Sequence, residues 1–329
     1  MALDLSQLIP ILAKLEAEDR LAELDTVEFP ETGVTRWLFG LAADFYFARD
    51  EQVDRREVMI DLAEGYYDRT DGRCNFMSAG PTFTIKSRDD IRNKLTEGRA
   101  ARRYWDRRQN GGFYIKHNYP EPMRNGDPVH DWFSCLIPGL VSTNGELQYL
   151  TRLKALRDHP DTVVADFVAT CAALKIFYAV QGFSLLTLGN RPQRDAYPIY
   201  RRFPGLLYND LTGFSLEIEP ATDVILDVNW LTAIDSAMFE KIGGMEAAQD
   251  ILSDEVVLHP FDGGMVFQAG PTPRIGDINR GDIPKPYREV NELLRPLRFT
   301  DWQMPFLSTP QDVNAMEATE DWIRRFDAS

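Results

Sequence analysis

The sequence predicts an α+β fold in which mixed or antiparallel sheets are flanked by helices. Short apolar or alternating runs of residues are typical of strands, and longer stretches with apolar residues at helical spacing are typical of helices. The composition is that of a globular chain, because 44% of the residues are apolar, 26% are charged, and 6 Trp, 12 Tyr and 19 Phe can fill a large core. A length of 329 residues suits one large domain or two closely packed ones.

In the first part of the chain, apolar spacing and aromatic content predict each element in turn. Apolar residues from Leu5 to Leu15 recur at helical spacing, which predicts a helix over the first two dozen residues, bent near Pro10. The further elements expected are a buried strand at Trp37–Ala48, a helix from about Val53 to Tyr66, short strands at Thr82–Lys86 and Phe113–His117, and a helix with the apolar stripe Val163, Phe167, Cys171, Leu174 and Tyr178.

The second part of the chain begins with a stretch in which Phe214, Leu216 and Ile218 alternate with polar residues, which predicts a strand with one solvated face. The adjacent Gly243 and Gly244 weaken the helix that contains them by about 1 kcal/mol each relative to alanine. The other elements expected are a buried strand at Asp223–Leu231, a helix at Ser236–Leu252 with Met238, Ile242, Met245 and Leu252 turned inward, a hairpin turning at Asp262-Gly263-Gly264, and helices near Pro286–Leu294 and Val313–Phe326.

Both parts of the chain follow the order strand, helix, strands. This order predicts two intimately packed halves, residues 1–190 and 191–329, and raises the hypothesis of a diverged duplication. No low-complexity linker separates them. The best candidates for interior loops are the proline-containing stretches Tyr119–Pro128 and Asn190–Pro198.

The charge of the chain argues against binding to nucleic acid. There are 36 basic and 51 acidic residues, for a net charge of −15, and such a field repels phosphate backbones. The stretch Arg92–Arg108 is an exception, with seven bases against two acids and with Tyr104 and Trp105 inside it. Against the charge of the whole chain, this stretch is expected to pair with the protein's own acidic surface.

The cysteines and the apolar runs indicate the cellular location. Cys74, Cys135 and Cys171 are odd in number and widely spaced, which is not a disulfide framework, so we expect them to be reduced and unpaired. The first residues lack a basic region and are typical of an amphipathic helix rather than a signal peptide. No apolar run approaches the roughly 18 residues of a membrane span. These features predict a cytoplasmic protein without a membrane partner.

No motif in the chain predicts a nucleophile, a phosphate-binding loop, a metal site or a cofactor. The four histidines, at 117, 130, 159 and 259, show no metal-ligand spacing, and the neighbourhood of His130 and Cys135 is no evidence for a catalytic pair. The stretch beginning Asp277-x-Asn279 resembles a calcium loop, but Arg288 stands where that loop requires a bidentate glutamate. No metal or cofactor is therefore expected.

Acidic residues near the predicted strands raise the alternative hypothesis that the protein is an enzyme. Glu217 and Glu219 share one face of a strand, which is either an acid/base pair or simply the solvated face. Asp227 and Asn229 interrupt a strand that otherwise looks buried, although side-chain bonds to neighbouring backbone explain many such residues. With Asp235, these acids would serve a carboxylate- or metal-dependent hydrolase.

The most distinctive stretch of the chain is Gly263–Arg298, GGMVFQAGPTPRIGDINRGDIPKPYREVNELLRPLR. Together with LDVNWL at Leu226–Leu231 and FEKIGG at Phe239–Gly244, it resembles the type VI secretion immunity-protein family, most strongly over about residues 200–300. Members of that family are encoded beside antibacterial effectors and protect the producing cell and its siblings. The resemblance implies a protein that acts by binding, with these residues as scaffold.

Acidic residues are concentrated in two segments. Asp210–Glu255 carries eleven acids and one base, and the first 31 residues carry eight acids and two bases. Because an acidic face attracts a basic partner and nucleases need basic surfaces, we expect a basic effector to bind here. The residues expected at this interface, on and after the Ser236–Leu252 helix, are Glu240, Glu246, Asp250, Asp254 and Glu255.

The resemblance thus implies an immunity protein that neutralises a cognate effector, of nuclease type, and the acidic charge suggests that it does so by occluding the effector's active or substrate-binding surface. The hydrolase is the alternative, and a structural component of a secretion apparatus is a third hypothesis. The oligomeric state stays open.

Overall fold

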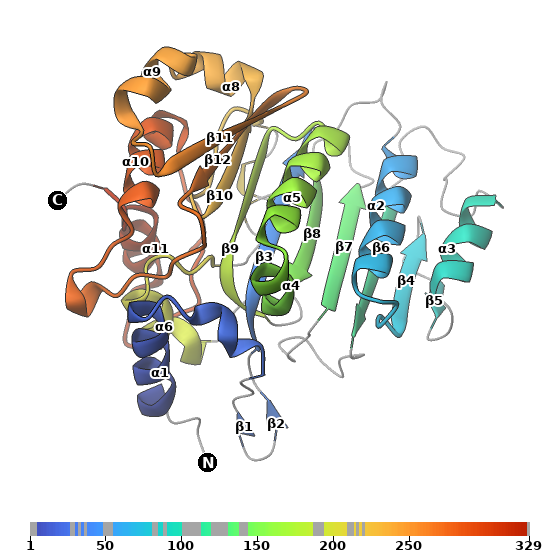
Figure 1. Cartoon of the computed structure of the whole chain (residues 1–329), viewed down its shortest axis with the longest axis horizontal. Coiled ribbons are helices and arrows are strands. Elements are labelled where there is room, and N and C mark those ends of the chain that lie inside the picture. The colour runs from blue at the N-terminus through green and yellow to red at the C-terminus, as the bar shows by residue number, and fades with distance from the viewer. Residues whose placement is uncertain are drawn as a thin grey trace.

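A ten-stranded antiparallel sheet runs through the structure, a computed structural model (Figure 1). The structure describes residues 5–26, 30–31, 34–35, 38–48, 55–80, 85–87, 91–100, 113–119, 131–137, 144–186, 194–208, 214, 217–218 and 221–327. The strands are β1 Pro30–Glu31, β2 Val34–Thr35, β3 Leu38–Phe47, β4 Phe76–Gly80, β5 Ile85–Ser87, β6 Phe113–Tyr119, β7 Asp131–Ile137, β8 Gly145–Thr151, β9 Tyr178–Leu186, β10 Leu231–Asp235, β11 Val256–Phe261 and β12 Gly264–Ala269.

The strand order of the large sheet is β11-β12-β10-β9-β3-β8-β7-β6-β4-β5, and β1 and β2 form a separate pair. Helices lie at α1 Leu5–Ala17, α2 Arg56–Arg69, α3 Ile91–Ala100, α4 Leu153–Asp158, α5 Pro160–Leu174, α6 Tyr197–Arg202, α8 Ser236–Lys241, α9 Gly244–Ile251, α10 Lys285–Leu294 and α11 Ala315–Ile323. The predicted α+β fold is confirmed, and its large sheet is antiparallel. None of the described helices is long and apolar enough to cross a membrane.

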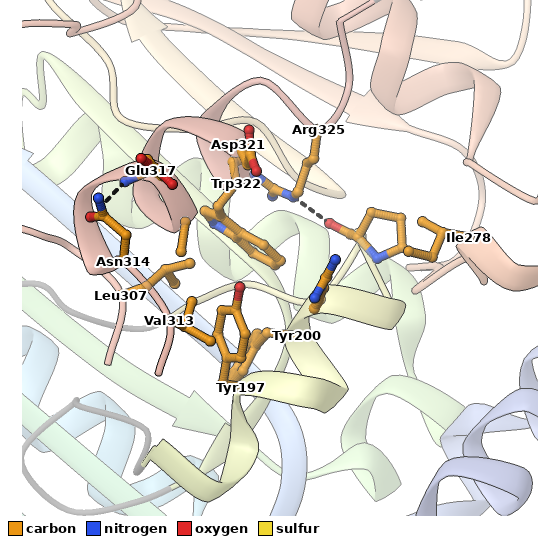
Figure 2. Close-up of a pocket in the computed structure, with 13 residues that line it drawn as sticks. Tyr197, Tyr200, Ile278, Leu307, Val313, Asn314, Glu317, Asp321, Trp322 and Arg325 are labelled. Atoms are coloured by element: carbon orange, nitrogen blue, oxygen red, sulfur yellow. Dashed lines mark hydrogen bonds between the residues drawn. The ribbon is translucent and has the colours of Figure 1, made fainter. Parts of the chain in front are cut away.

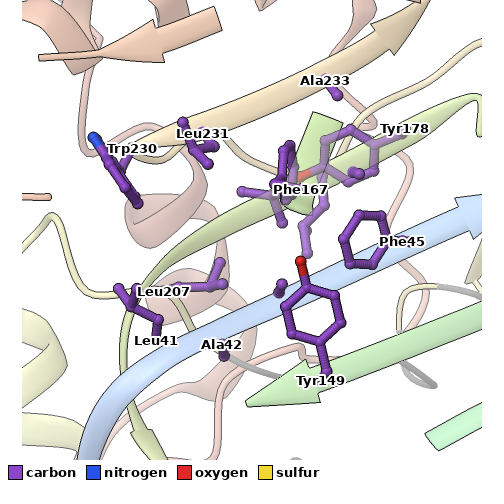
Figure 3. Close-up of a cluster of buried hydrophobic side chains, with 14 of the residues drawn as sticks. Leu41, Ala42, Phe45, Tyr149, Phe167, Tyr178, Leu207, Trp230, Leu231 and Ala233 are labelled. Atoms are coloured by element: carbon purple, nitrogen blue, oxygen red, sulfur yellow. The ribbon is translucent and has the colours of Figure 1, made fainter. Parts of the chain in front are cut away.

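The central strand β3 is covered on both faces of the sheet. Neighbouring residues of a strand point to opposite faces. Phe45 accordingly packs on Phe167 of α5, at 5.0 Å between ring centroids, whereas Tyr46 stacks on Tyr178 at 5.5 Å and meets Phe214 at 5.0 Å. Figure 3 shows Phe45 and Phe167 among the buried side chains of this core. Burial on both faces explains why this strand is mostly apolar along its length, with Asp44 as an exception, instead of alternating.

The two halves of the chain share the one sheet. Strand β10, from the second half, pairs with β9 from the first, with Leu231 opposite Gln181 and Ile234 opposite Tyr178. Residues on both sides of the predicted division therefore contribute to one continuous sheet. The division at residue 190 and the duplication remain predictions.

The hairpin and several elements lie where the sequence predicts them. Strands β11 and β12 pair from Val256–Ala269 to Phe261–Gly264, and the turn uses Gly263 at a φ of 108°, a conformation that favours glycine. Strand β3, strand β6 and the helices α2, α10 and α11 match expected elements within a few residues. Helix α1 ends at Ala17, before the end of the two dozen residues expected, and a short 3₁₀ helix follows at Leu21–Thr26.

The predicted strand at Phe214–Glu219 is wrong. The described residues Phe214 and Glu217 are helical, and the Ile218 N–H donates to the Phe214 carbonyl at 3.1 Å. Phe214 and Ile218 are both buried because they are four residues apart on one helical turn. Phe214 and Ile218, whose spacing had suggested an alternating strand, therefore lie on one side of a helical turn.

The segment Asp223–Leu231 is buried from Ile225 onward, as expected, while Asp223 is exposed, and most of the segment is not a strand. Side chains replace the bonds of a sheet here: Asp227 accepts the Val228 N–H at 2.7 Å, and Asn229 accepts the Trp230 N–H at 2.9 Å. Only Ile225 makes a strand-like bridge, and regular pairing begins at Leu231.

Two further expectations need correction. Tyr178 does not continue the helical stripe, because Lys175 adopts a left-handed conformation (φ 51°) that ends α5, and Tyr178 begins β9. The expected loop Asn190–Pro198 contains the start of α6, where Pro198 occupies the first turn. Parts of Thr82–Lys86, Arg92–Arg108, Tyr119–Pro128 and Asn190–Pro198 lie outside the described residues, as do Glu219 and His130.

Candidate functional site

The five acids expected to face a partner come from α8, α9 and the turn before β11. All five side chains are exposed, and Figure 1 places α8 and α9 together at one end of the molecule. We call this set the acidic surface. It consists of Glu240, Glu246, Asp250, Asp254 and Glu255.

Helix α8 is tied closely to the sheet. Asp235, the last residue of β10, caps the helix by accepting the Met238 N–H at 2.8 Å. Met238 and Phe239 are buried, and the Phe239 ring meets Phe267 of β12 at 6.1 Å. Partial burial raises the pKa of Asp235, against the opposing effect of the backbone N–H groups that it accepts. Glu240 therefore projects from a helix whose other side is held.

The helix expected over Ser236–Leu252 is interrupted. Gly243 and Gly244 have φ values of 99° and 60°, so α8 ends and α9 begins with a new direction. The break changes which residues of α9 face the core. Ala248 is buried, and Met245, which was expected to point inward, is 45% exposed.

The turn between α9 and β11 is held by one carboxylate. Glu289 of α10 accepts both the Ser253 N–H at 3.1 Å and the Ser253 hydroxyl at 2.7 Å. Although partial burial raises the pKa of Glu289, these bonds and Lys285 together lower it from its ordinary value. Asp254 and Glu255 follow directly and remain exposed.

Neighbouring bases offset little of the negative charge on the acidic surface. Lys241 is paired with Asp223 at 2.8 Å, and Lys285 is 3.1 Å from Glu289 but 3.9 Å from Glu255. The hydrogen bond from Lys241 lowers the pKa of Asp223. Apart from the long contact with Lys285, no ion pair to the acidic surface occurs among the described residues, so its charges face solvent.

The acidic residues of the first 31 positions are less available to a binding partner than those of the acidic surface. Glu16 is buried, and it accepts the Arg274 side chain at 2.6 Å and the Gly276 N–H at 2.9 Å. Arg20 pairs with Glu18 at 2.7 Å and with Glu23 at 2.6 Å. Several charges of this segment thus hold α1 and its neighbours in place.

The described carboxylates proposed for a hydrolase, Glu217, Asp227 and Asp235, are each engaged with a different part of the protein. Glu217 accepts the Gln303 and Met304 N–H groups, each at 3.1 Å, and Asp235 caps α8. Asp227 pairs with Arg325 at 2.6 Å, and both side chains are 7% exposed. Each of these acids therefore has a structural partner. The described residues contain no group of three or more potential metal ligands.

Two of the described histidines and all three cysteines lie in structural surroundings. His117 is buried with its Nε2 3.1 Å from the Ala63 carbonyl, and His259 lies 2.8 Å from the Gln268 amide oxygen. The three cysteines are buried and free, at Cys74, Cys135 and Cys171. Burial raises the pKa of Cys74 and of Cys135 to about 12, so little thiolate exists at neutral pH.

The expected behaviour of the basic stretch is seen at its described start. Arg92 of α3 forms an ion pair with Asp68 of α2, so this guanidinium pairs with the protein's own acid.

Sequence reasoning did not anticipate a cleft of about 370 Å³ between α6 and α11 (Figure 2). Its aromatic walls are Tyr197, Tyr200 and Trp322, and the carboxylates Glu317 and Asp321 belong to its lining. Helices α6 and α11 are more than 100 residues apart in the chain. The only signal available was the cluster of aromatic residues in each segment, which is equally typical of a core.

Comparisons with known proteins give a family and a fold. A family model described as type VI immunity for VRR-NUC (TsiV) matches residues 155–326. The solved structure of a Pseudomonas aeruginosa T6SS protein is similar with a TM-score of 0.73 and 16% sequence identity, over 97% of this chain and 91% of that one. This likeness concerns the fold alone. No curated protein sequence matches the chain.

Proposed function

Because the chain belongs to the TsiV family of type VI immunity proteins, we propose that it neutralises a cognate VRR-NUC effector by covering that effector's active or substrate-binding surface. The observation that carries the proposal is the acidic surface, whose five side chains are all exposed on anchored elements. A nuclease must present basic groups to the phosphates of its substrate. An acidic protein that occupies those groups excludes the substrate.

In this proposal, the protein acts in the cytoplasm by binding the effector, and it catalyses no reaction of its own. The carboxylates offered for a hydrolase support this, since Glu217, Asp227 and Asp235 are occupied by backbone or arginine partners. The buried thiols support it as well.

Titration of the candidate effector, the product of the neighbouring gene, with the purified protein tests this function. Residual nuclease activity should fall linearly and reach its minimum at a fixed molar ratio, because each inhibitor molecule occupies one effector surface. Bovine serum albumin at the same concentrations is the control. Loss of all activity at a small fraction of that ratio, growing with time, would indicate turnover and contradict the proposal.

Reversing the charge of Glu246, Asp250 and Asp254 to lysine together is expected to slow association with the effector about tenfold or more at low salt. Electrostatic attraction steers the encounter of the two proteins, and salt screens it. The variant should also show a flatter dependence of the association rate on salt. Stopped-flow or surface-based kinetics over a salt series measures both quantities.

A matched control changes the net charge equally but elsewhere. Glu57, Asp61 and Asp158 are exposed on α2 and α4, away from α9, and their reversal to lysine should reduce the association rate much less. Equal slowing by both triple variants would show that only the overall charge matters. An unchanged rate for the first variant at low salt would rule out the acidic surface as the steering site.

A further inference from the structure

The cleft between α6 and α11 has the walls of a side-chain receptor. Figure 2 shows Tyr197 and Tyr200 on one side and Trp322 on the other, with Leu307 and Val313 beside them. The rings of Tyr200 and Trp322 meet edge to face at 5.7 Å, which holds the walls in place. Recesses with aromatic walls are the places where protein partners insert the residues that dominate binding.

The rim of the cleft favours a cation. Glu317 and Asp321 are exposed and four residues apart on α11, so they share one face of the helix and repel each other. From Ser308 to Ile323 the chain has four acids and no base. A positive charge between Glu317 and Asp321 would relieve their repulsion.

The two arginines in the lining do not cancel this preference. Arg325 is paired with Asp227, donates to the Pro204 carbonyl at 2.5 Å, and lies over the Trp322 ring at 3.9 Å. Its charge is therefore already compensated inside the protein. Arg201, which is exposed, is the remaining base of the lining against the two carboxylates.

The cleft lies on the same end of the molecule as the acidic surface. In Figure 1, α9, α10 and α11 follow one another along that end, and α6 lies next to α11. Ile278, 43% exposed, adds an apolar residue to the mouth of the cleft. The helices that form the cleft and the helix α9 of the acidic surface are therefore at the same end of the molecule.

We propose that this cleft is the anchor site of the complex and receives one lysine or arginine side chain of the cognate effector. The aliphatic stem of that side chain packs against Tyr197 and Val313, and its charged head lies between Glu317 and Asp321. The inference rests on the proposed function, and it names the recess that holds the effector after the acidic surface has attracted it.

Steering and anchoring have different kinetic signatures, which makes the inference testable. Charges that stay in solvent in the complex act mainly on the association rate, whereas charges that the inserted side chain covers, as proposed for Glu317 and Asp321, act mainly on the dissociation rate. The double variant Glu317→Gln/Asp321→Asn keeps the side-chain shapes and removes both charges. We expect it to dissociate from the effector about tenfold or more faster, with an association rate within about twofold of the wild type.

The variant Tyr197→Ala, which removes a half-buried wall, should also raise the dissociation rate. Glu320→Gln is the matched control, because Glu320 is exposed on the same helix but does not line the cleft, and it should leave both rates unchanged. Thermal unfolding of each variant verifies that it is folded. Substitution of individual surface lysines and arginines of the effector then identifies the inserted residue, whose loss should have no further effect on the double variant.

Each outcome has one meaning. If the wild-type protein does not bind the effector, the proposed function fails. If it binds and the double variant and Tyr197→Ala both dissociate at the wild-type rate, the cleft proposal fails while the proposed function stands. If the wild-type protein forms a dimer that the double variant cannot form, the occupant is a second copy of this chain, and the cleft proposal is again overturned.

Discussion

Replacing Arg325 by alanine is expected to lower the free energy of unfolding by about 3–5 kcal/mol. Arg325 and Asp227 are joined at 2.6 Å, and each side chain is 7% exposed. Loss of the guanidinium leaves the Asp227 carboxylate in the interior without its ion-pair partner, and the backbone N–H of Val228, at 2.7 Å, still donates to it. The change also removes the stacking of Arg325 on Trp322 and on Phe326, at 3.9 and 4.3 Å from the ring centroids.

Urea unfolding of the wild type and of the variant measures this difference. Arg324→Ala is the control, because the neighbouring Arg324 is exposed and lies 3.9 Å from Glu320, and an exposed pair of this kind contributes about 0–1 kcal/mol. Adding Asp227→Ala to Arg325→Ala should recover part of the loss, since no unpaired carboxylate remains. A cost for Arg325→Ala no greater than that of the control would contradict a buried, obligatory pair.

Acidification from pH 6.5 to pH 4 is expected to remove about 3 kcal/mol of stability through His117 alone. Burial lowers the pKa of His117 from its ordinary value of 6.5 to about 4, against smaller opposing effects of the Ala63 carbonyl and of Asp131. The unfolded chain therefore takes up a proton in this range and the folded protein does not. The contribution is complete above pH 6.5 and falls by about 1.4 kcal/mol per pH unit down to pH 4.

The variant His117→Phe should have a smaller slope of unfolding free energy against pH in that window, because its ring carries no proton. The site can hold the replacement, since His117 stacks on Phe133 at 5.1 Å and lies 5.4 Å from Tyr66. His159→Gln, which changes an exposed histidine, is the control. Titration of the His117 ring by NMR gives a direct check, and a native midpoint near pH 6.5 would disprove the prediction.

Local patterns predicted those elements whose cause is local. The hairpin at Asp262–Gly264 follows from turn residues that tolerate positive φ, and β3 follows from an apolar run that is rich in aromatic residues and has about the length of a strand. The failures have the opposite origin. Phe214 and Ile218 fit either period over so short a stretch, and packing against Tyr46 and its neighbours selected the helical turn.

The break between α8 and α9 shows how far a local rule reaches. The glycine pair predicted a weak helix, and only the direction in which the chain has to pass from β10 to β11 required the two positive φ values. That change of direction exposed Met245 and buried Ala248. It did not alter the exposure of Glu246 and Asp250, because charged side chains remain in solvent unless they find a partner.

Three features were determined by the sequence alone: the α+β class, the acidic residues that form the acidic surface, and the resemblance to an immunity family. They could be found in this way because composition, hydrophobic period and short motifs are properties of residues that are neighbours in the chain. Only the tertiary structure decided which acids are occupied and which are free. Asp227 looked available until Arg325, 98 residues later, proved to be its partner. The cleft of Tyr197 and Trp322 likewise exists only because folding joins distant segments, and the energy of such long-range contacts is not encoded in any local pattern.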